Sequence, residues 1–416
     1  MQGKSDIYEG LNLFDLDYQN IQTGQAWAEA NLNGDSEAAS LCLEYALGGK
    51  NILGIRQQTG LLIHWLQTGL AAAKKVSEKL SEEDCYTGLG LAYCRLGDTR
   101  VGIDHHNKAL AIAQVVSDKK GEAIALGNLG IAYENLGDYN RALELHELAL
   151  KLDREIGNRR GEGSNLSNLG NTHAVLGNPR LSITYLEKAL RVAEQMGDLR
   201  AESNRLSNLG VTYTDLGEYA KAIEYFKRSL AISRQLRDKR GESADLTNLG
   251  LVFAEIGEIE NAIECHQTAL DIAQLTGDKN AESSDWGNLG AAHARLQDFN
   301  RAIACYERCI TLARETKNRQ LEATQFGNLG AAYLELGEYK TAVNFFERSL
   351  RMLRHIGDLE GVANQLGNLG EVNARMGNMT DAQALFIESL KIFEEIESPS
   401  ANTVRKNLAE LTTIHM

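Results

Sequence analysis

The sequence predicts an all-α fold in which pairs of helices stack along one direction, and three observations support this. The tetrad Gly127-Asn128-Leu129-Gly130, or a close variant of it, returns six more times at intervals of forty residues, the last being Gly367-Asn368-Leu369-Gly370. The chain contains only two prolines, Pro179 and Pro399. Most glycines fall at fixed positions of the repeat, where they mark turns. Such a period is typical of stacked supersecondary units, so chain length counts repeats here.

Each forty-residue unit divides into two helices and two turns. In the unit of the first tetrad, the first helix contains the tetrad, 136–139 form a turn, 140–155 form the second helix and 156–159 form a loop. Gly130 leaves the first helix without a side chain at the contact, at a cost of about 1 kcal/mol relative to alanine. Ala142 does the same from the second helix. Leucines such as Leu150 are then expected to fill the space between units.

The two ends of the chain depart from this pattern. Residues 1–80 are expected to form a helical N-terminal cap with a degenerate repeat, with helices at 15–32, 36–47 and 57–77. Gly48 and Gly49 are expected to close the second of these helices. Eight regular units follow over 81–397. A break at 398–400 then separates them from a last helix at 401–414, which makes 398–416 a C-terminal capping segment.

Charge and hydropathy exclude several kinds of partner. The formal charge of −14 disfavours binding to nucleic acid, because neutralising phosphates requires a basic surface. The sequence contains no apolar run long enough to span a bilayer, and its first ten residues lack the hydrophobic segment of a signal peptide. We therefore expect a cytoplasmic protein that binds neither nucleic acid nor membrane.

The six cysteines do not form a metal-binding or disulfide pattern. None lies in a Cys-x-x-Cys pair, and most occupy ordinary helix positions of the repeat, so we expect reduced, partly buried thiols. Cys305 and Cys309 are four residues apart on an expected helix and share one face. A third ligand would allow them to hold a soft metal, but no histidine stands at a suitable spacing. The sequence predicts no metal and no cofactor.

Catalytic motifs are absent from the sequence. Gly49-Lys50 approaches a phosphate-binding loop, but Glu44 replaces its first glycine and Asn51 replaces its hydroxyl residue. No serine lies in a Gly-x-Ser-x-Gly turn. His105-His106 would suit a metal, yet His106 matches positions that fill the interhelical core in later units, which favours a packing role. We expect the protein not to be an enzyme.

The repeat resembles that of a known family. Its shared positions follow the order of the tetratricopeptide repeat consensus: Leu129, Gly130, Tyr133, Gly137, Ala142, Ala149 and Leu150. The resemblance covers 81–397 and implies a right-handed superhelical solenoid of antiparallel helix pairs. The usual repeat has about 34 residues and a proline after its second helix, whereas this one has forty and no proline there. The longer form is similar to the repeats of spindle-orientation scaffolds and of bacterial signalling NTPases of the NB-ARC (STAND) type.

The N-terminal region favours the second of these groups. Residues 10–15, 20–28 and 65–75 look like the segment that joins the NTPase and winged-helix modules to the repeats in NB-ARC-type proteins. This resemblance implies that the chain is the sensor region of a signalling or defence NTPase.

In this family the first helices of the repeats line a concave face, which implies that a peptide or protein is held there. On this chain the upper edge of that face is a basic column formed by Lys120, Arg160, Arg200 and Arg240. One interpretation is that the column pairs with carboxylates of an acidic ligand, since arginine binds carboxylates in a bidentate manner. The other is that these side chains only complement the preceding helix dipole or acidic residues nearby.

Ligand discrimination requires positions that differ between units, whereas a structural role requires constant ones. The constant asparagine of the tetrad, such as Asn128, is therefore expected to form hydrogen bonds between helices. The variable polar positions of the first helices are the better candidates for contacts, and they are Asn171, Asn204, Asp215, Glu255, Arg295, Glu371 and Arg375, with Thr214 on the same face.

The sequence thus predicts a noncatalytic protein-binding solenoid with a peptide or protein ligand on its concave face, and an acidic ligand where the basic column takes part in binding. The first hypothesis is the sensor region of a STAND-type protein. The alternative is a stand-alone scaffold that bridges protein partners. An enzyme with a site assembled from distant units is the remote third possibility.

Overall fold

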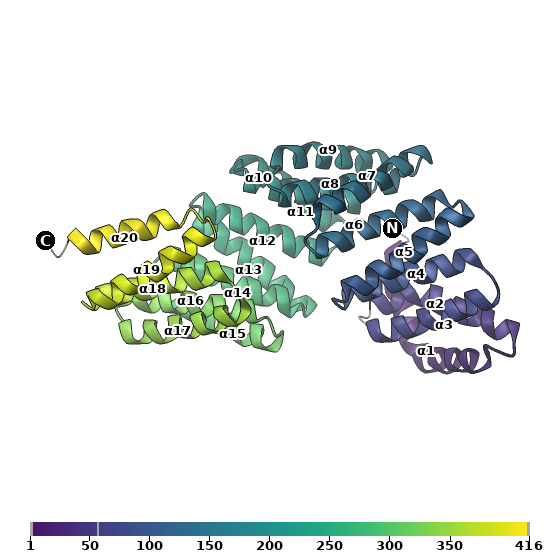
Figure 1. Ribbon diagram of the computed structural model, residues 1–416, viewed down its shortest axis with the longest axis horizontal. Coiled ribbons are helices and arrows are strands. Elements are labelled where there is room, and N and C mark those ends of the chain that lie inside the picture. The colour runs from purple at the N-terminus through teal and green to yellow at the C-terminus, as the bar shows by residue number, and fades with distance from the viewer. Residues whose placement is uncertain (1–2, 56–57, 414–416) are drawn as a thin grey trace. The chain divides into compact units, whose positions relative to one another are not determined.

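A computed structural model describes the backbone of residues 3–55 and 58–413, and the side chains of 13–50, 52–53 and 58–411. The described backbone forms twenty α-helices and no strand (Figure 1). It divides into two compact units, residues 1–212 and 213–416, and the division falls within α10. The first half of the helices are α1 (Gly3–Asn31), α2 (Ser36–Ile55), α3 (Thr59–Lys75), α4 (Lys79–Arg95), α5 (Thr99–Val116), α6 (Lys119–Asn135), α7 (Tyr139–Glu155), α8 (Arg159–Val175), α9 (Pro179–Met196) and α10 (Leu199–Asp215). The remainder are α11 (Tyr219–Gln235), α12 (Lys239–Glu255), α13 (Ile259–Thr276), α14 (Lys279–Arg295), α15 (Phe299–Glu315), α16 (Arg319–Glu335), α17 (Tyr339–Ile356), α18 (Leu359–Arg375), α19 (Met379–Glu395) and α20 (Ala401–Thr413).

The forty-residue period arises from two half-periods of equal length. From α4 to α19 a helix begins every twenty residues, each helix having 17 or 18 residues. Aspartate or asparagine side chains cap many of these helices; Asp138, for example, accepts a hydrogen bond from the backbone N–H of Arg141 at 3.2 Å. Glycine supplies the left-handed residue after many helices, as Gly137 does at φ 79°. The repeat is therefore punctuated by helix caps at both ends.

Helices with even numbers from α4 to α18 contain the tetrad and are called A helices; the odd-numbered α5 to α19 that follow them are called B helices. Within each unit an A helix packs on the B helix that follows it in sequence, as α6 does on α7 and α12 does on α13. In addition, consecutive A helices touch one another, as α6 touches α8 in the first unit and α14 touches α16 in the second. This arrangement confirms the all-α fold of antiparallel helix pairs.

The second tetrad glycine allows the two helices of a pair to approach closely. A Cβ on Gly130 would lie 2.4 Å from Cε1 of His146, and a Cβ on Gly330 would lie 2.6 Å from Cδ1 of Phe346. His146 and Phe346 occupy the same position of the B helix and are fully buried. The glycine is thus needed because a large side chain from the B helix lies directly against it, as expected.

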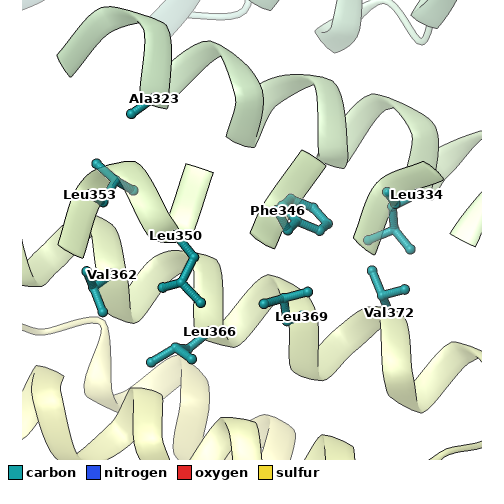
Figure 2. Close-up of a cluster of buried hydrophobic side chains, with 10 residues drawn as sticks. Ala323, Leu334, Phe346, Leu350, Leu353, Val362, Leu366, Leu369 and Val372 are labelled. Atoms are coloured by element: carbon teal, nitrogen blue, oxygen red, sulfur yellow. The ribbon is translucent and has the colours of Figure 1, made fainter. Parts of the chain in front are cut away.

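Large apolar side chains fill the space between successive pairs. In the cluster of Figure 2, Phe346 and Leu350 of α17 lie close to Leu366 and Leu369 of α18. All four are at most 8% exposed. Burying one such side chain contributes roughly 1.5–3 kcal/mol, so packing of this kind is a main source of stability in a stack whose repeats contact only their neighbours.

The expected end of the second helix is wrong. Helix α2 continues through Gly48 and Gly49 as far as Ile55. Gly49 is buried, and a Cβ there would lie 2.8 Å from Cε3 of Trp65, whereas a Cβ on Gly48 would meet nothing within 4 Å. Gly49 therefore provides close contact between α2 and α3 rather than a helix stop.

The last helix packs on the final B helix. Ala401, Val404 and Leu411 of α20 are buried in one cluster with Phe386 and Phe393 of α19. Helix α20 begins at Ala401, as expected; position 414, where its end was expected, lies outside the described residues.

Candidate functional site

The basic column lies at the start of consecutive A helices. Lys120, Arg160, Arg200 and Arg240 are each the second residue of their helix, and all four are exposed. Lys120, Arg160 and Arg200 belong to the first unit, and Arg240 belongs to the second. The shared position follows directly from the forty-residue period.

Aspartates that cap the next A helix approach two members of this column. Arg160 Nη2 donates to Asp198 Oδ2 at 3.2 Å, and Arg240 Nε lies 4.0 Å from Asp278 Oδ2. The arginine side chains remain 76% and 88% exposed, and exposed pairs of this kind contribute only about 0–1 kcal/mol. Asp198 and Asp278 thus reduce the local charge of the column but leave Arg160 and Arg240 open to solvent.

In the first unit a cavity of about 210 Å³ opens between α8, α9 and α10. Three of the expected contact residues line it: Arg160, Arg200 and Asn204. The remaining lining residues are Arg159, Gly163, Ser164, Ala189, Val192, Ala193, Met196, Asp198, Ala201 and Arg205. This lining combines four arginines with a single carboxylate and an aliphatic wall from α9.

The second unit has a cavity of about 250 Å³ at the same position of the repeat, between α16, α17 and α18. Its lining residues are Thr324, Asn328, Leu353, Asp358, Glu360, Gly361, Asn364 and Gln365. Glu360 stands where Arg200 stands in the first unit, and Gln365 stands where Arg205 stands. The two cavities share a position but differ in charge.

Two of the expected contact residues pair with each other. Arg295 Nη2 donates to Glu255 Oε1 at 2.8 Å, joining α14 to α12, and Arg295 also donates to the carbonyl of Ala254. Forty-residue symmetry repeats the pair further on, where Arg375 Nη2 donates to Glu335 Oε1 at 3.0 Å. These side chains form links between successive A helices of the second unit.

The other expected contact residues lie apart from this pair. Asn204 is exposed at the cavity of the first unit, while Asn171 accepts a hydrogen bond from Asn208 Nδ2 at 3.1 Å. Thr214 and Asp215 end α10, and partial desolvation raises the pKa of the Asp215 carboxyl above its usual range. Within each unit the candidates therefore form separate groups.

The tetrad asparagines do not all act in the same way. Asn208 reaches the neighbouring A helix, as expected for a bond between helices. In contrast, Asn328 and Asn368 donate to Gln325 and Gln365 on their own helices, at 3.0 and 3.4 Å. The side chain at the position three residues before the asparagine decides which bond forms.

Sequence reasoning assigns Ile131, Val211 and Leu251 to the floor of the concave face, but it missed that exposed apolar side chains recur at this position of the A helices, here called the apolar column. Leu91, Ile131 and Val211 in the first unit and Leu251 in the second occupy one position of the repeat and are 40–43% exposed. The signal was their common phase, one residue after the second tetrad glycine or its equivalent. Apolar side chains that remain exposed at a regular spacing are typical of a contact surface for a protein.

Sequence reasoning also missed Arg205, which lies on the side of α10 that packs in the core, where charged residues are rare. The only signal was a change of residue type at a position that is uncharged or acidic in the other units.

Buried polar groups elsewhere serve packing. His106 and His266 are at most 1% exposed, and desolvation by burial lowers the pKa of each to about 4. Asp285 is also buried, its pKa is raised to about 6 by desolvation, and it accepts a hydrogen bond from Thr247 Oγ1 at 2.9 Å. Within the described part of the chain no three His, Cys, Asp or Glu side chains converge as metal ligands would. None of the described helices combines the length and the apolar character that crossing a bilayer requires.

Comparison with known proteins identifies the repeat. A family model described as "tetratricopeptide repeat" matches residues 82–155, 161–235, 203–275, 242–315 and 282–355, which is more than half of the chain. The chain belongs to the tetratricopeptide repeat family. No curated protein sequence matches this tetratricopeptide repeat protein significantly.

Several solved structures share its fold. One is a signal transduction ATPase with numerous domains (STAND) with a tetratricopeptide repeat sensor from Pyrococcus horikoshii, which is 15% identical with a TM-score of 0.61. The match covers 84% of the present chain and 54% of that chain. The quorum sensor NprR from B. thuringiensis is 18% identical with a TM-score of 0.57, over 84% of the present chain and 99% of its own. A Rap protein complexed with competence and sporulation factor is 14% identical with a TM-score of 0.51, over 80% and 98% of the two chains. At these identities the similarity concerns the fold.

Proposed function

We propose that this tetratricopeptide repeat protein is a noncatalytic interaction module that binds a peptide or protein on the exposed face of its A helices. The observation that carries the proposal is the exposed apolar column that includes Ile131 of α6 and Val211 of α10, because α10 also lines the arginine-rich cavity of the first unit. An apolar strip beside fixed polar donors is the usual composition of a peptide-binding surface, since apolar burial supplies affinity and polar groups fix orientation.

The polar contacts that we assign to this face are Lys120, Arg160, Asn171, Arg200, Asn204, Thr214, Asp215, Arg240, Glu255 and Arg295. The basic members favour an acidic ligand, because charge complementarity raises the rate of association and selects the partner. Weak intramolecular pairs such as Arg160 with Asp198 do not oppose this, since an exposed ion pair exchanges easily for a ligand carboxylate.

We further propose that the chain is the sensor region of a cytoplasmic STAND-type protein. In this assignment residues 1–80 form a cap next to the sensor, 81–397 form eight repeats and 398–416 cap the far end. The structural similarity to a STAND protein with a tetratricopeptide repeat sensor supports the assignment, as do the N-terminal segments at 10–15, 20–28 and 65–75. Two further structural neighbours are a quorum sensor and a Rap protein complexed with competence and sporulation factor, which agrees with a role in capturing a polypeptide signal.

The experiment is affinity capture from the native cell extract on the immobilised chain, followed by a binding titration of the captured polypeptide against variants. Charge reversal at Arg160, Arg200 and Arg240 should weaken binding at least about tenfold, because it replaces attraction by like-charge repulsion. Leu148→Glu on the exposed side of α7 is the control and should bind normally. Unchanged affinity after charge reversal would remove the basic column from the site, and loss of binding in the α7 variant alone would move the site to the B helices.

A further inference from the structure

Arg205 is the single basic residue at its position of the repeat. In the other repeats with a full tetrad, the equivalent residues are Ala125, Asn165, Asp245, Asp285, Gln325 and Gln365. This position faces the junction between an A helix and the preceding pair, and at five of the six equivalents the side chain is buried or partly buried and polar. A full positive charge there demands a compensating group, since burying an unpaired charge is costly.

In two neighbouring repeats the residue at this position has a hydrogen-bond partner on the preceding B helix, twelve residues earlier. Asn165 donates to Asp153 Oδ2 at 2.8 Å, and Asp245 accepts from Ser233 at 3.2 Å. The residue twelve positions before Arg205 is Ala193, which cannot form a hydrogen bond through its side chain. Arg205 therefore lacks the hydrogen-bond partner that the preceding B helix provides in these two repeats.

The guanidinium of Arg205 is only partly satisfied. Its Nη2 donates to the carbonyl of Gly163 over 3.4 Å, close to the limit of a hydrogen bond, and its buried Nε has no hydrogen-bond partner. Desolvation lowers the pKa of Arg205, which the charge of Asp198 partly offsets. Buried donors are nearly always paired in folded proteins, so a guanidinium that lines a cavity and has an unpaired Nε and one long hydrogen bond has donor capacity left for an acceptor.

The cavity beside Arg205 suits a carboxylate on an aliphatic stem. Its volume of about 210 Å³ far exceeds the roughly 10–15 Å³ that one water molecule requires. Arg160 and Arg200 lie at its rim, while Val192 and Met196 of α9 form an aliphatic wall. Asp198 already places one carboxylate against Arg160 in this cavity, which demonstrates that the lining accepts the group.

We propose that this cavity, here called the Arg205 pocket, receives a glutamate side chain of the bound polypeptide. The carboxylate accepts from the guanidinium of Arg205, and the two methylene groups lie along Val192 and Met196. The proposal rests on the proposed function, because the glutamate belongs to the bound polypeptide. The pocket itself recognises only the glutamate side chain. The equivalent cavity of the second unit is not expected to do so, because it has Gln365 in place of Arg205 and Glu360 in place of Arg200.

The test uses N-acetyl-L-glutamate α-amide as the probe, with N-acetyl-L-glutamine α-amide as its uncharged match. The methyl resonance of Met196 in the full chain reports occupancy of the pocket, and the resonance of Met352 on α17 is the internal reference. We expect the glutamate probe to shift the Met196 signal and the glutamine probe to bind at least about tenfold more weakly, since a charge-assisted hydrogen bond is lost.

The decisive variant is Arg205→Gln, because glutamine is the natural residue at 325 and 365 and the repeat accommodates it. Its affinity for the glutamate probe should fall about tenfold or more. Arg180→Gln, which removes an exposed charge at the other end of α9, should change it less than about twofold. Should Arg205→Gln fail to fold, Arg205→Lys keeps the charge but removes the guanidinium, and it should also lose most of the affinity.

Four outcomes would overturn the proposal. They are equal shifts with both probes, unchanged affinity in folded Arg205→Gln, full affinity in Arg205→Lys, and tighter binding of inorganic phosphate than of the glutamate probe. The last would assign the pocket to phosphoryl groups. If the glutamate probe binds but no polypeptide is captured from the extract, only the proposed function is overturned. If a polypeptide binds and its affinity is unchanged in Arg205→Gln, only the role of the Arg205 pocket is overturned.

Discussion

Arg295 Nη2 donates to Glu255 Oε1 at 2.8 Å, across forty residues of sequence and from one A helix to the next. Both side chains vary in charge from unit to unit, as contact residues do, yet here they neutralise each other. The pair Arg375 and Glu335 repeats the arrangement. Variation along the A helices therefore reflects bonding between units as well as ligand choice.

The first prediction concerns the strength of this pair. A double-mutant cycle of Arg295→Ala and Glu255→Ala should give a coupling energy below about 1 kcal/mol, because both side chains are roughly half exposed. The coupling should decrease further between low and high salt. Urea unfolding of the four chains measures it. A coupling of several kcal/mol would mean that the pair is structural and not available to a ligand.

The second prediction uses adjacent glycines in α2. Gly48→Ala should stabilise the chain by up to about 1 kcal/mol, since the position is exposed and an added methyl group meets nothing. Gly49→Ala should destabilise it by about 1–3 kcal/mol, since the methyl group would lie 2.8 Å from the ring of Trp65. Urea unfolding midpoints of the two variants should move in opposite directions. Equal shifts would contradict the placement of Trp65.

The third prediction concerns Asp153, which is 2% exposed and accepts hydrogen bonds from Asn158 Nδ2 at 2.7 Å and Asn165 Nδ2 at 2.8 Å. Asp153→Ala should cost about 1–3 kcal/mol, because Asn165 is left buried without that acceptor. Adding Asn165→Ala should recover much of the loss, since the preceding unit carries Ala113 and Ala125 at these positions. Urea unfolding tests this, and a double variant less stable than the single one would refute the reasoning.

The fourth prediction is a pH dependence from His106. Burial lowers the pKa of His106 from its ordinary value to about 4, so below pH 6.5 the unfolded chain binds more protons than the folded chain. Stability attributable to this residue is therefore complete above pH 6.5 and is lost as pH falls toward 4, by about 2 kcal/mol between pH 7 and pH 5.

His106→Phe measures this term, because Phe226, Phe346 and Phe386 occupy the same position in other units. The variant should lose less stability than the wild type between pH 7 and pH 5, and the exposed His355→Gln is the matched control. The carboxyl of Glu83, whose pKa desolvation raises to about 7, titrates in both chains and cancels in the comparison. An identical pH profile for the two proteins would show that His106 is charged in the folded chain.

The fold could be predicted from the sequence because each structural position recurs in many repeats. Gly130, Ala142 and Leu150 recur at one phase, so their roles follow from period and size alone. Gly49 occurs once and outside the repeat, where a glycine that ends a helix and a glycine that contacts Trp65 look identical in sequence. Only the position of the neighbouring helix distinguishes the two roles.

The site was less predictable for a related reason. The first-helix positions of Arg160, Arg200 and Asn204 were identified from the period, and the structure places all three at one cavity. The partner of Arg160 was not identified, because the bond between Arg160 and Asp198 depends on how closely successive repeats pack. Arg205 was missed because its importance lies in the absence of a partner at Ala193, which a single sequence does not display.

Amide hydrogen exchange of the full chain, with and without the polypeptide captured from the native extract, tests the central claim most directly. The account predicts that the polypeptide slows exchange in A helices, with the largest effect at the start of α8 and α10, and leaves the exposed side of α7 unchanged. Slower exchange confined to B helices, or no change in any helix at saturating polypeptide, would contradict it.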